Sequence, residues 1–193
     1  MQRITPPMLP AVDLAPLKAH LRIDEDHEDG HLRHLIEVAT EQVETRLSRQ
    51  LVMATWSFTL PKWPRSGMVE LTRPPIAAVT EVRYWDAAGV EQTLAPAADW
   101  YRTRADVEPG QLVFLPNVVF PDHDDRDDAI TVEFMAGYGD SANDVPSSIR
   151  HAIMVLAAHY YAMREPVVAG TTVAKIPDNL DALIGSASWG RWP

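Results

Sequence analysis

The segment His27-Glu28-Asp29-Gly30-His31 has the residue types of a hydrolytic zinc site. When an H-E-x-x-H motif lies inside a helix, two histidines one turn apart bind the metal and the glutamate activates a water molecule. Here the segment lies at the start of a helix expected from about residue 28 to 48, and Gly30 weakens the turn that would align the imidazoles. His34 also stands where the longer form of the motif has glycine. A small zinc-dependent hydrolase is therefore kept as an alternative, and a solvated loop that caps the helix is preferred.

The same loop partly matches a calcium-binding loop, with Asp24, Asp26 and Glu28 at alternating positions. Such a loop needs glycine at its sixth position and a bidentate glutamate at its twelfth, where this sequence has Asp29 and Leu35. A second acidic run at residues 122–128 has no spacing that defines a coordination sphere, and it is typical of a charged surface turn. We expect no metal and no cofactor at either place.

A glycine-rich stretch, AGYGDSANDVPSSIR at residues 136–150, resembles a phosphate-binding loop before a helix. A dinucleotide loop of the G-x-G-x-x-G type would need glycine where this chain has Ala142. A P-loop would need Lys-Ser or Lys-Thr at the helix start, where the sequence reads Val145-Pro146-Ser147-Ser148. The stretch is better interpreted as a joint in which Pro146 lies in the first turn of the following helix.

Composition narrows the class of protein further. The 193 residues are 46% hydrophobic and contain no apolar run long enough to span a bilayer and no signal peptide, so we expect a chain that stays in the compartment where it is made. The absence of cysteine excludes disulfides and thiol nucleophiles. A formal net charge of −10 opposes binding to nucleic acid, so DNA near this protein should slide past it.

The periodicity of the chain predicts helices at both ends and strands between them. Leucines recur at helical spacing in DLAPLKAHL, and the helix over residues 28–48 has one apolar stripe made of Leu32, Leu35, Ile36, Ala39, Val43 and Leu47. From Ala54 onward, about six short alternating segments predict a small antiparallel β region: TWSFTL, MVELT, VTEVRYW, VEQTLA, LVFLP and AITVEFM. The piece VRYWDAAGVEQTL predicts a hairpin with Asp86 and Gly89 in its turn. The aromatic residues of this region favour a sheet core or a subunit contact over a ligand site.

The last long helix is expected over SSIRHAIMVLAAHYYAMRE, ending at Glu165-Pro166. One face carries Ile149, Ile153, Leu156, Tyr160 and Met163. The opposite face is also small or apolar, and its residues are a predicted subunit contact: His151, Val155, Ala158 and Ala162. The remaining chain ends in SASWGRWP, and two tryptophans so close to a terminus are typical anchors for a partner's pocket.

Taken together, these segments resemble the head-tail connector (adaptor) proteins of long-tailed bacteriophages and of phage-derived gene transfer agents. The resemblance rests on LKAHLRID, the helix HLRHLIEVATEQVETRLSRQL, TRPPIAAVTEVRYWDAAG, then GYG, VPSSIRHAIMVLAAHYYAMRE and IPDNLDALIG, in that order over nearly the whole chain. It implies a non-catalytic virion protein at the neck, where the head meets the tail. There it would form a homo-oligomeric ring, expected to be a dodecamer, beneath the portal, extend the DNA channel through its lumen and receive the stopper or tail-terminator protein.

The resemblance also implies an arrangement of parts. The fold class would be α+β, with a ring-forming helical part, an inserted antiparallel β region and an extended tail. The expected boundaries are 1–53 for the N-terminal helices, 54–136 for the β region, 137–165 for the long helix and 166–193 for the tail. By position, the tail would bind the portal through Ile176, Leu180, Leu183, Ile184, Trp189, Arg191 and Trp192. Members of the family often end on a basic or tyrosine-containing segment, whereas this chain ends in SASWGRWP.

A third interpretation is an adhesive β module, such as a tail or baseplate component. It differs from a connector in predicting partner contacts through the β region and none through the C-terminus.

Overall fold

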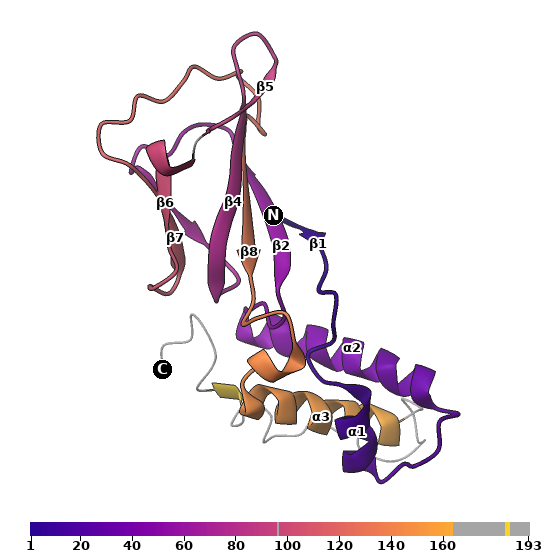
Figure 1. The fold of residues 1–193 in the computed structure, drawn as a ribbon. Coiled ribbons are helices and arrows are strands. Elements are labelled where there is room, and N and C mark those ends of the chain that lie inside the picture. Colours follow the sequence, from indigo (N-terminus) through magenta and orange to yellow (C-terminus); the bar gives the residue numbers. More distant parts are fainter. Residues whose placement is uncertain (96, 164–183, 186–193) are drawn as a thin grey trace, which may run out of the picture. The chain divides into compact units, whose positions relative to one another are not determined.

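The computed structural model describes residues 1–95, 97–163 and 184–185. The described residues form an α+β fold with three α-helices and eight β-strands (Figure 1). The chain divides into two compact units. The β unit consists of Met1–Pro7 and Met53–Tyr138, and the helical unit consists of Met8–Val52 and the described residues from Gly139 onward.

The helical unit contains α1 (Leu14–Leu21), α2 (Asp29–Leu47) and α3 (Ser147–Ala162). The predicted apolar stripe of α2 is buried at all six positions. It packs on the buried face of α3, formed by Ile149, Ala152, Ile153, Leu156 and Ala157. Glu28, just before α2, contacts Tyr161 near the end of α3, while Val52 beyond α2 bridges to Gly139 ahead of α3. The two long helices are therefore antiparallel neighbours, as Figure 1 shows.

Both N-terminal helices end on a residue in the left-handed conformation. The φ angle is 57° at Arg22 after α1 and 54° at Ser48 after α2. In each case the next amide closes the turn: Ile23 donates to the carbonyl of Lys18, and Arg49 donates to that of Glu44. These bonds satisfy carbonyls that a helix end otherwise leaves without a partner. They fix the direction in which the chain leaves each helix although no glycine is present.

The glycine-rich stretch before α3 contains a short 3-10 turn, Ala142–Asp144. Ser141 and Asp144 form a capping box in which the Asp144 carboxylate accepts hydrogen bonds from both the backbone N and the Oγ of Ser141, each 2.9 Å long. Pro146 directly precedes the first helical residue, one position earlier than the first-turn place expected from the sequence. The joint is thus held by its own side chains.

The β unit contains a five-stranded antiparallel sheet in the order β1-β2-β8-β4-β5. Its strands are β1 (Gln2–Thr5), β2 (Ala54–Leu60), β4 (Ile76–Trp85), β5 (Glu91–Thr93) and β8 (Ile130–Ala136). The central strand β8 alternates strictly, with Ile130, Val132, Phe134 and Ala136 buried. This period of two places every second side chain of β8 in the core.

A second sheet has the order β3-β7-β6, with β3 (Met68–Leu71), β6 (Tyr101–Arg104) and β7 (Gly110–Phe114). A 3-10 turn, Ala97–Asp99, leads into β6. Leu71 and Leu112 from this sheet share one hydrophobic core with Val82, Val132 and other residues of the first sheet. The two sheets therefore fold together as one unit.

Two of the strands were not predicted from the sequence. β1 lies in the proline-rich start and is polar, so no local sequence pattern predicts a strand there. It is a strand because it pairs with β2, and the register of this pairing is irregular. β6 reads Tyr-Arg-Thr-Arg and buries only Tyr101. The predicted hairpin is confirmed: Arg83, Tyr84 and Trp85 pair with Thr93, Gln92 and Glu91, and Gly89 has a φ of 75° in the turn.

Candidate assembly surfaces

The H-E-x-x-H segment lies at a helix start and its side chains have structural partners. Helix α2 begins at Asp29, so His27 and Glu28 precede it and the two histidines are not one helical turn apart inside a helix. Glu28 accepts a hydrogen bond from the hydroxyl of Tyr161, and the ring of His31 lies 6.3 Å from that of Tyr161. The segment joins the start of α2 to the end of α3, which is a structural role.

A hollow of about 590 Å³ beside this segment is lined by His27, Glu28, His31, His34, Leu35, Tyr160 and Met163. Three imidazoles in one hollow would suit a metal only if they converged. Among the described residues, no group of three or more His, Cys, Asp or Glu side chains is arranged to hold a metal ion. The zinc-hydrolase alternative therefore has no support in the site geometry.

The acidic loop before α2 is tied down by Lys18 of α1. The Lys18 Nζ donates to carboxylate oxygens of Asp26 and Asp29, the latter at 2.9 Å. The hydrogen bond from Lys18 lowers the pKa of Asp26, and the hydrogen bond to Asp26 is the largest cause of the raised pKa of Lys18. Of the carboxylates that partly match a calcium loop, Asp26 is thus used, together with Asp29, to link α1 to the start of α2.

The predicted contact face of α3 is accessible in the single chain. His151 and Ala162 are exposed, and Val155 and Ala158 are half-buried. The ring of His151 lies edge-on to that of His20 of α1, with 6.1 Å between centroids. By contrast Ile149, Ile153 and Leu156 of the opposite face are buried, whereas Tyr160 is half-buried and Met163 is 46% exposed. The first three turns of α3 thus have a core face and a separate, sparsely charged outer face.

Most of the predicted portal-binding tail lies outside the described residues: Ile176, Leu180, Leu183, Trp189, Arg191 and Trp192. Ile184 is described and is 3% exposed. A portal contact through Ile184 would have to expose this side chain first.

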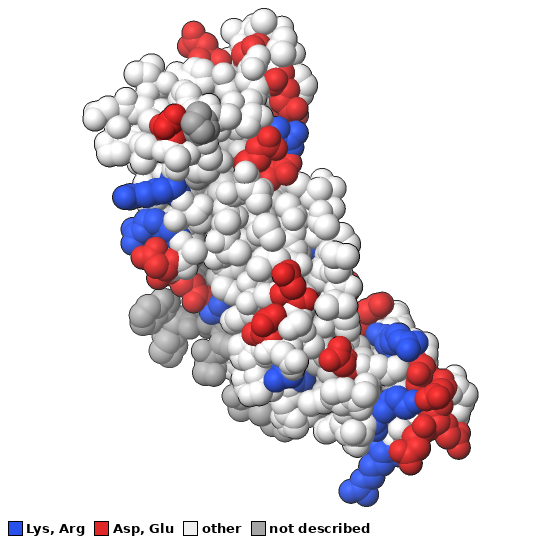
Figure 2. Space-filling model, in the orientation of Figure 1, with Lys and Arg blue, Asp and Glu red and all other residues white. Residues whose placement is uncertain are grey.

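Charged side chains are dispersed over the face of the molecule drawn in Figure 2. On the face drawn in Figure 2, lysines and arginines mostly lie beside aspartates and glutamates, and wide areas of both units are uncharged. Arg126, the cation inside the acidic run, pairs with Asp128 and lies 4.4 Å from the centre of the Trp85 ring. The described residues on this face therefore form no continuous basic track of the kind that DNA binding requires.

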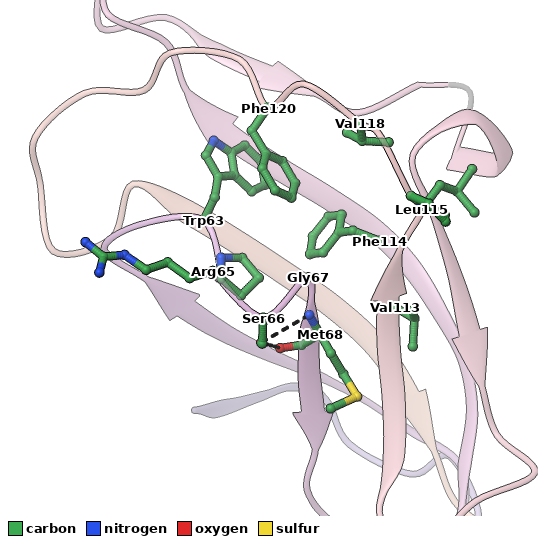
Figure 3. Close-up of a pocket in the computed structure, with 12 residues that line it drawn as sticks. Trp63, Arg65, Ser66, Gly67, Met68, Val113, Phe114, Leu115, Val118 and Phe120 are labelled. Carbon is green, nitrogen blue, oxygen red and sulfur yellow. Dashed lines mark hydrogen bonds between the residues drawn. The ribbon is translucent and has the colours of Figure 1, made fainter.

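The β unit also has an aromatic groove that the sequence analysis did not identify. Its volume is about 710 Å³, and it is lined by Trp63, Pro64, Arg65, Ser66, Gly67, Met68, Val113, Phe114, Leu115, Pro116, Val118 and Phe120 (Figure 3). Trp63 and Phe120 stack at 4.8 Å with an interplanar angle of 9°, and Phe114 meets Phe120 edge-on at 4.9 Å. Trp63 comes from the loop after β2 and Phe120 from the loop after β7, so only the tertiary fold brings them together.

Among the described residues, no helix is both long and apolar enough to cross a membrane.

Comparison with known proteins finds similarity to a family of head-tail connector proteins and to chains of virion necks. Residues 11–92 match the family of phage gp6-like head-tail connector proteins. Over its full length the chain is similar to a protein in the neck of an empty gene transfer agent particle, computed with sixfold symmetry. That match has 26% identity, a TM-score of 0.79 and coverage of 100% of this chain and 98% of the other.

Two further solved structures also match over the full length of this chain. A chain in the virion of a native gene transfer agent particle matches with 26% identity, a TM-score of 0.79 and coverage of 100% and 96%. A chain in the neck of a native particle, computed with twelvefold symmetry, matches with 27% identity, a TM-score of 0.73 and coverage of 100% and 98%. No curated protein matches the sequence. The resemblance to head-tail connectors inferred from the sequence is confirmed.

Proposed function

We propose that this protein, whose residues 11–92 match the phage gp6-like head-tail connector family, is a structural connector in the neck of a phage or gene transfer agent particle. The observation that carries the proposal is the match of the whole chain, both units included, to chains of such necks. The protein is a structural component of the particle and not an enzyme. The candidate catalytic motif is used to link α2 to α3, which agrees with this role.

The connector acts as a closed ring of identical copies, with a dodecamer as the expected size. A ring needs two different surfaces on each copy that meet head to tail. The outer face of α3, with His151, Val155, Ala158 and Ala162, supplies one of them because it is accessible and carries little charge. Small side chains such as Ala158 and Ala162 also allow a neighbouring helix to approach closely.

The ring adds to the portal through the C-terminal tail. Trp189 and Trp192 anchor the tail, together with Ile176, Leu180, Leu183, Ile184 and Arg191. Large aromatic side chains next to an arginine are the residue types that dominate binding energy when they enter a partner's pocket. On its other side, the ring receives the stopper or tail-terminator protein.

Deleting residues 166–193 tests the tail. We expect the shortened chain to keep the far-ultraviolet circular dichroism of the helical and β units and to lose its binding to portal rings in negative-stain images. Because Ile184 is buried in the full chain, a second variant, Trp189→Ala with Trp192→Ala, removes the anchors while keeping Ile184. If either variant still joins portal rings as the unaltered chain does, the tail is not the portal contact.

DNA passes through the lumen of this ring without specific binding. Each copy contributes a net charge of −10, and a ring multiplies this charge. Like charges on the wall and on the phosphates oppose adsorption at the salt concentration of a cell, where screening extends over about 8 Å.

The zinc-hydrolase alternative predicts stoichiometric zinc in protein purified without chelator. Elemental analysis that finds less than one zinc per ten chains would exclude this alternative, and the connector proposal is unaffected by that result.

A further inference from the structure

The aromatic groove of the β unit is partly open, and apolar side chains stand at its mouth. Met68 is 38% exposed, and Val119, between the lining residues Val118 and Phe120, is 85% exposed. Gly67, with a φ of 66°, and the hydrogen bonds between Ser66 and Met68 hold the turn that presents Met68 (Figure 3). Exposed apolar side chains beside a ring-lined hollow are typical of a binding surface.

The groove is built on fixed side chains. The indole Nε1 of Trp63 donates a hydrogen bond of 3.0 Å to the carbonyl of Pro121, which ties the loop after β7 to the loop after β2. The Trp63 ring also lies 5.6 Å from the ring of Tyr84 in β4. A preorganised groove loses little freedom when it binds, so most of its contact energy is available to a partner.

One wall of the groove continues directly into the acidic run. Asp122 follows Pro121, whose carbonyl accepts the bond from Trp63, and residues 122–128 hold five aspartates and one arginine. That arginine, Arg126, is already paired with Asp128. Asp122, Asp125 and Asp127 are exposed, and no lysine or arginine of the described residues forms a salt bridge with them.

The lining of the groove also includes one cation. Arg65 belongs to the lining loop, and Figure 3 shows its side chain extending away from the rings of Trp63, Phe114 and Phe120. The groove therefore has an aromatic floor, an acidic segment that continues from one of its walls and one basic side chain among its lining residues.

We propose that this groove is the docking site for the neck protein on the side of the ring away from the portal. The segment that enters it carries an apolar side chain next to a lysine or arginine: the apolar group packs on Trp63, Phe114 and Phe120, and the cation faces the acidic run. This inference rests on the proposed connector function. A second copy of this chain is a poor occupant because each copy is itself strongly acidic.

The test uses the full-length ring, its portal, and the other purified neck proteins of the same particle. Val119→Lys places a cation where the partner's own cation must approach, and Val119→Ile keeps the apolar surface. Val90→Lys is the matched control, because Val90 is 52% exposed in the same unit and its chain neighbours do not line the groove, whereas Val119 stands between two lining residues.

We expect Val119→Lys to form rings and to bind the portal normally, while its Kd for the next neck protein rises tenfold or more, as expected when one aliphatic contact is lost. Val119→Ile and Val90→Lys should bind that protein as the unaltered ring does. The double variant Asp122→Lys with Asp125→Lys should raise the same Kd and reduce its dependence on salt, while Asp99→Lys, outside the run, should not.

Three results would overturn the inference. An unchanged Kd for Val119→Lys would show that the groove does not bind this partner. Loss of ring formation in Val119→Lys, with its circular dichroism unchanged, would make the groove a contact between copies. Failure of the unaltered ring to bind any neck protein would overturn both this inference and the connector function, so the two failures are distinguishable.

Discussion

At the scale of single residues, the polar side chains that resemble catalytic groups serve the fold. Lys18 links Asp26 of the loop before α2 to Asp29 at the start of α2, and Glu28 links that loop to Tyr161. Asp144 closes the joint before α3. In each case the side chain holds two segments of the fold together, so substitution is expected to change stability and not a chemical activity.

Glu44 is the buried carboxylate on which the end of α2 depends. Its Oε1 accepts a hydrogen bond of 2.7 Å from the Gln50 side-chain amide and one of 2.9 Å from the Leu51 backbone N. Glu44→Ala would leave these buried donors without this acceptor, and we expect it to lower the free energy of unfolding by about 2–4 kcal/mol. Urea denaturation followed by circular dichroism measures this change.

The control for Glu44 is Glu41→Ala on the exposed side of the same helix, expected to change stability by less than about 0.5 kcal/mol. Equal effects of the two substitutions would contradict the role assigned to Glu44.

Glycine is required at position 139 because the side chain of Asp144 approaches it closely, and not because a nucleotide binds there. A Cβ at this position would lie 2.4–2.6 Å from side-chain atoms of Asp144, whose carboxylate is held by two hydrogen bonds from Ser141. Gly139→Ala should therefore destabilise the helical unit by about 1–3 kcal/mol, as overpacking does. Thermal unfolding is the measurement.

Gly30→Ala is the matched comparison for Gly139→Ala, because a Cβ at Gly30, inside α2, meets nothing within 4 Å. It should stabilise the protein by up to about 1 kcal/mol through helix propensity. A destabilising Gly30→Ala with a neutral Gly139→Ala would reverse our interpretation of both glycines.

Asp86 should make the β4–β5 hairpin sensitive to acid. Its carboxylate accepts hydrogen bonds from the backbone N of Val90 and of Ala88 and from the Gln92 side chain, and the bond from Val90 is the largest cause of its lowered pKa. The pKa of Asp86 in the folded protein lies below the ordinary value of 3.8. The ionised carboxylate therefore stabilises the folded hairpin at a pH above 3.8, and this stabilisation is lost as the pH falls through the folded pKa.

An NMR titration of the Asp86 carboxyl carbon checks this prediction. We expect its midpoint in the folded protein to lie below its midpoint in an isolated peptide of residues 83–93. Asp86→Asn should remove the hairpin's response to acid, and equal midpoints in protein and peptide would refute the proposed cause.

At the scale of elements, α3 is the helix for which we propose two uses, one in the core and one in the contact between copies. Its buried face completes the core with α2, so Ile153→Asp, at a fully buried position, would damage folding and could not report on assembly. Ala162, at the exposed last position of the helix, is a better probe. A lysine there is compatible with folding because a cation is favourable at a helix C-terminus.

We expect Ala162→Lys to keep the helical content of the protein and to weaken ring assembly at least tenfold, because a long charged side chain replaces a methyl group in a close helix contact. Light scattering after size-exclusion chromatography in the presence of portal measures the assembled fraction. Gln42→Lys, exposed on α2, introduces the same side chain outside this face and should assemble normally. Normal assembly of Ala162→Lys would remove this face from the ring contact.

At the scale of the whole molecule, net charge is the property that bears on function. The protein should not retard duplex DNA in gel-shift assays at about 0.1 M salt, where phosphate contacts still dominate binding. Replacing exposed carboxylates of the helical unit by their amides, at Asp24, Glu25, Glu37 and Glu41, should leave rings intact but increase DNA retention in particles. Unchanged retention and ejection of DNA would count against an acidic lumen.

The sequence by itself determined the elements with strong local signals. The apolar stripe of α2, the hairpin turn at Asp86 and Gly89 and the alternation of β8 were all predictable, because each depends on spacing along the chain. The order of the segments also sufficed to indicate the connector family.

Only the tertiary structure decided the features that depend on residues far apart in the sequence. β1 is a strand because β2 offers it hydrogen bonds, and Gly139 matters because Asp144 folds back against it. The aromatic groove joins Trp63 to Phe120 across 57 positions, so no local pattern could predict it. Periodicity reports which side of an element is apolar, whereas long-range packing decides which apolar side chains are covered and which remain at the surface for a partner.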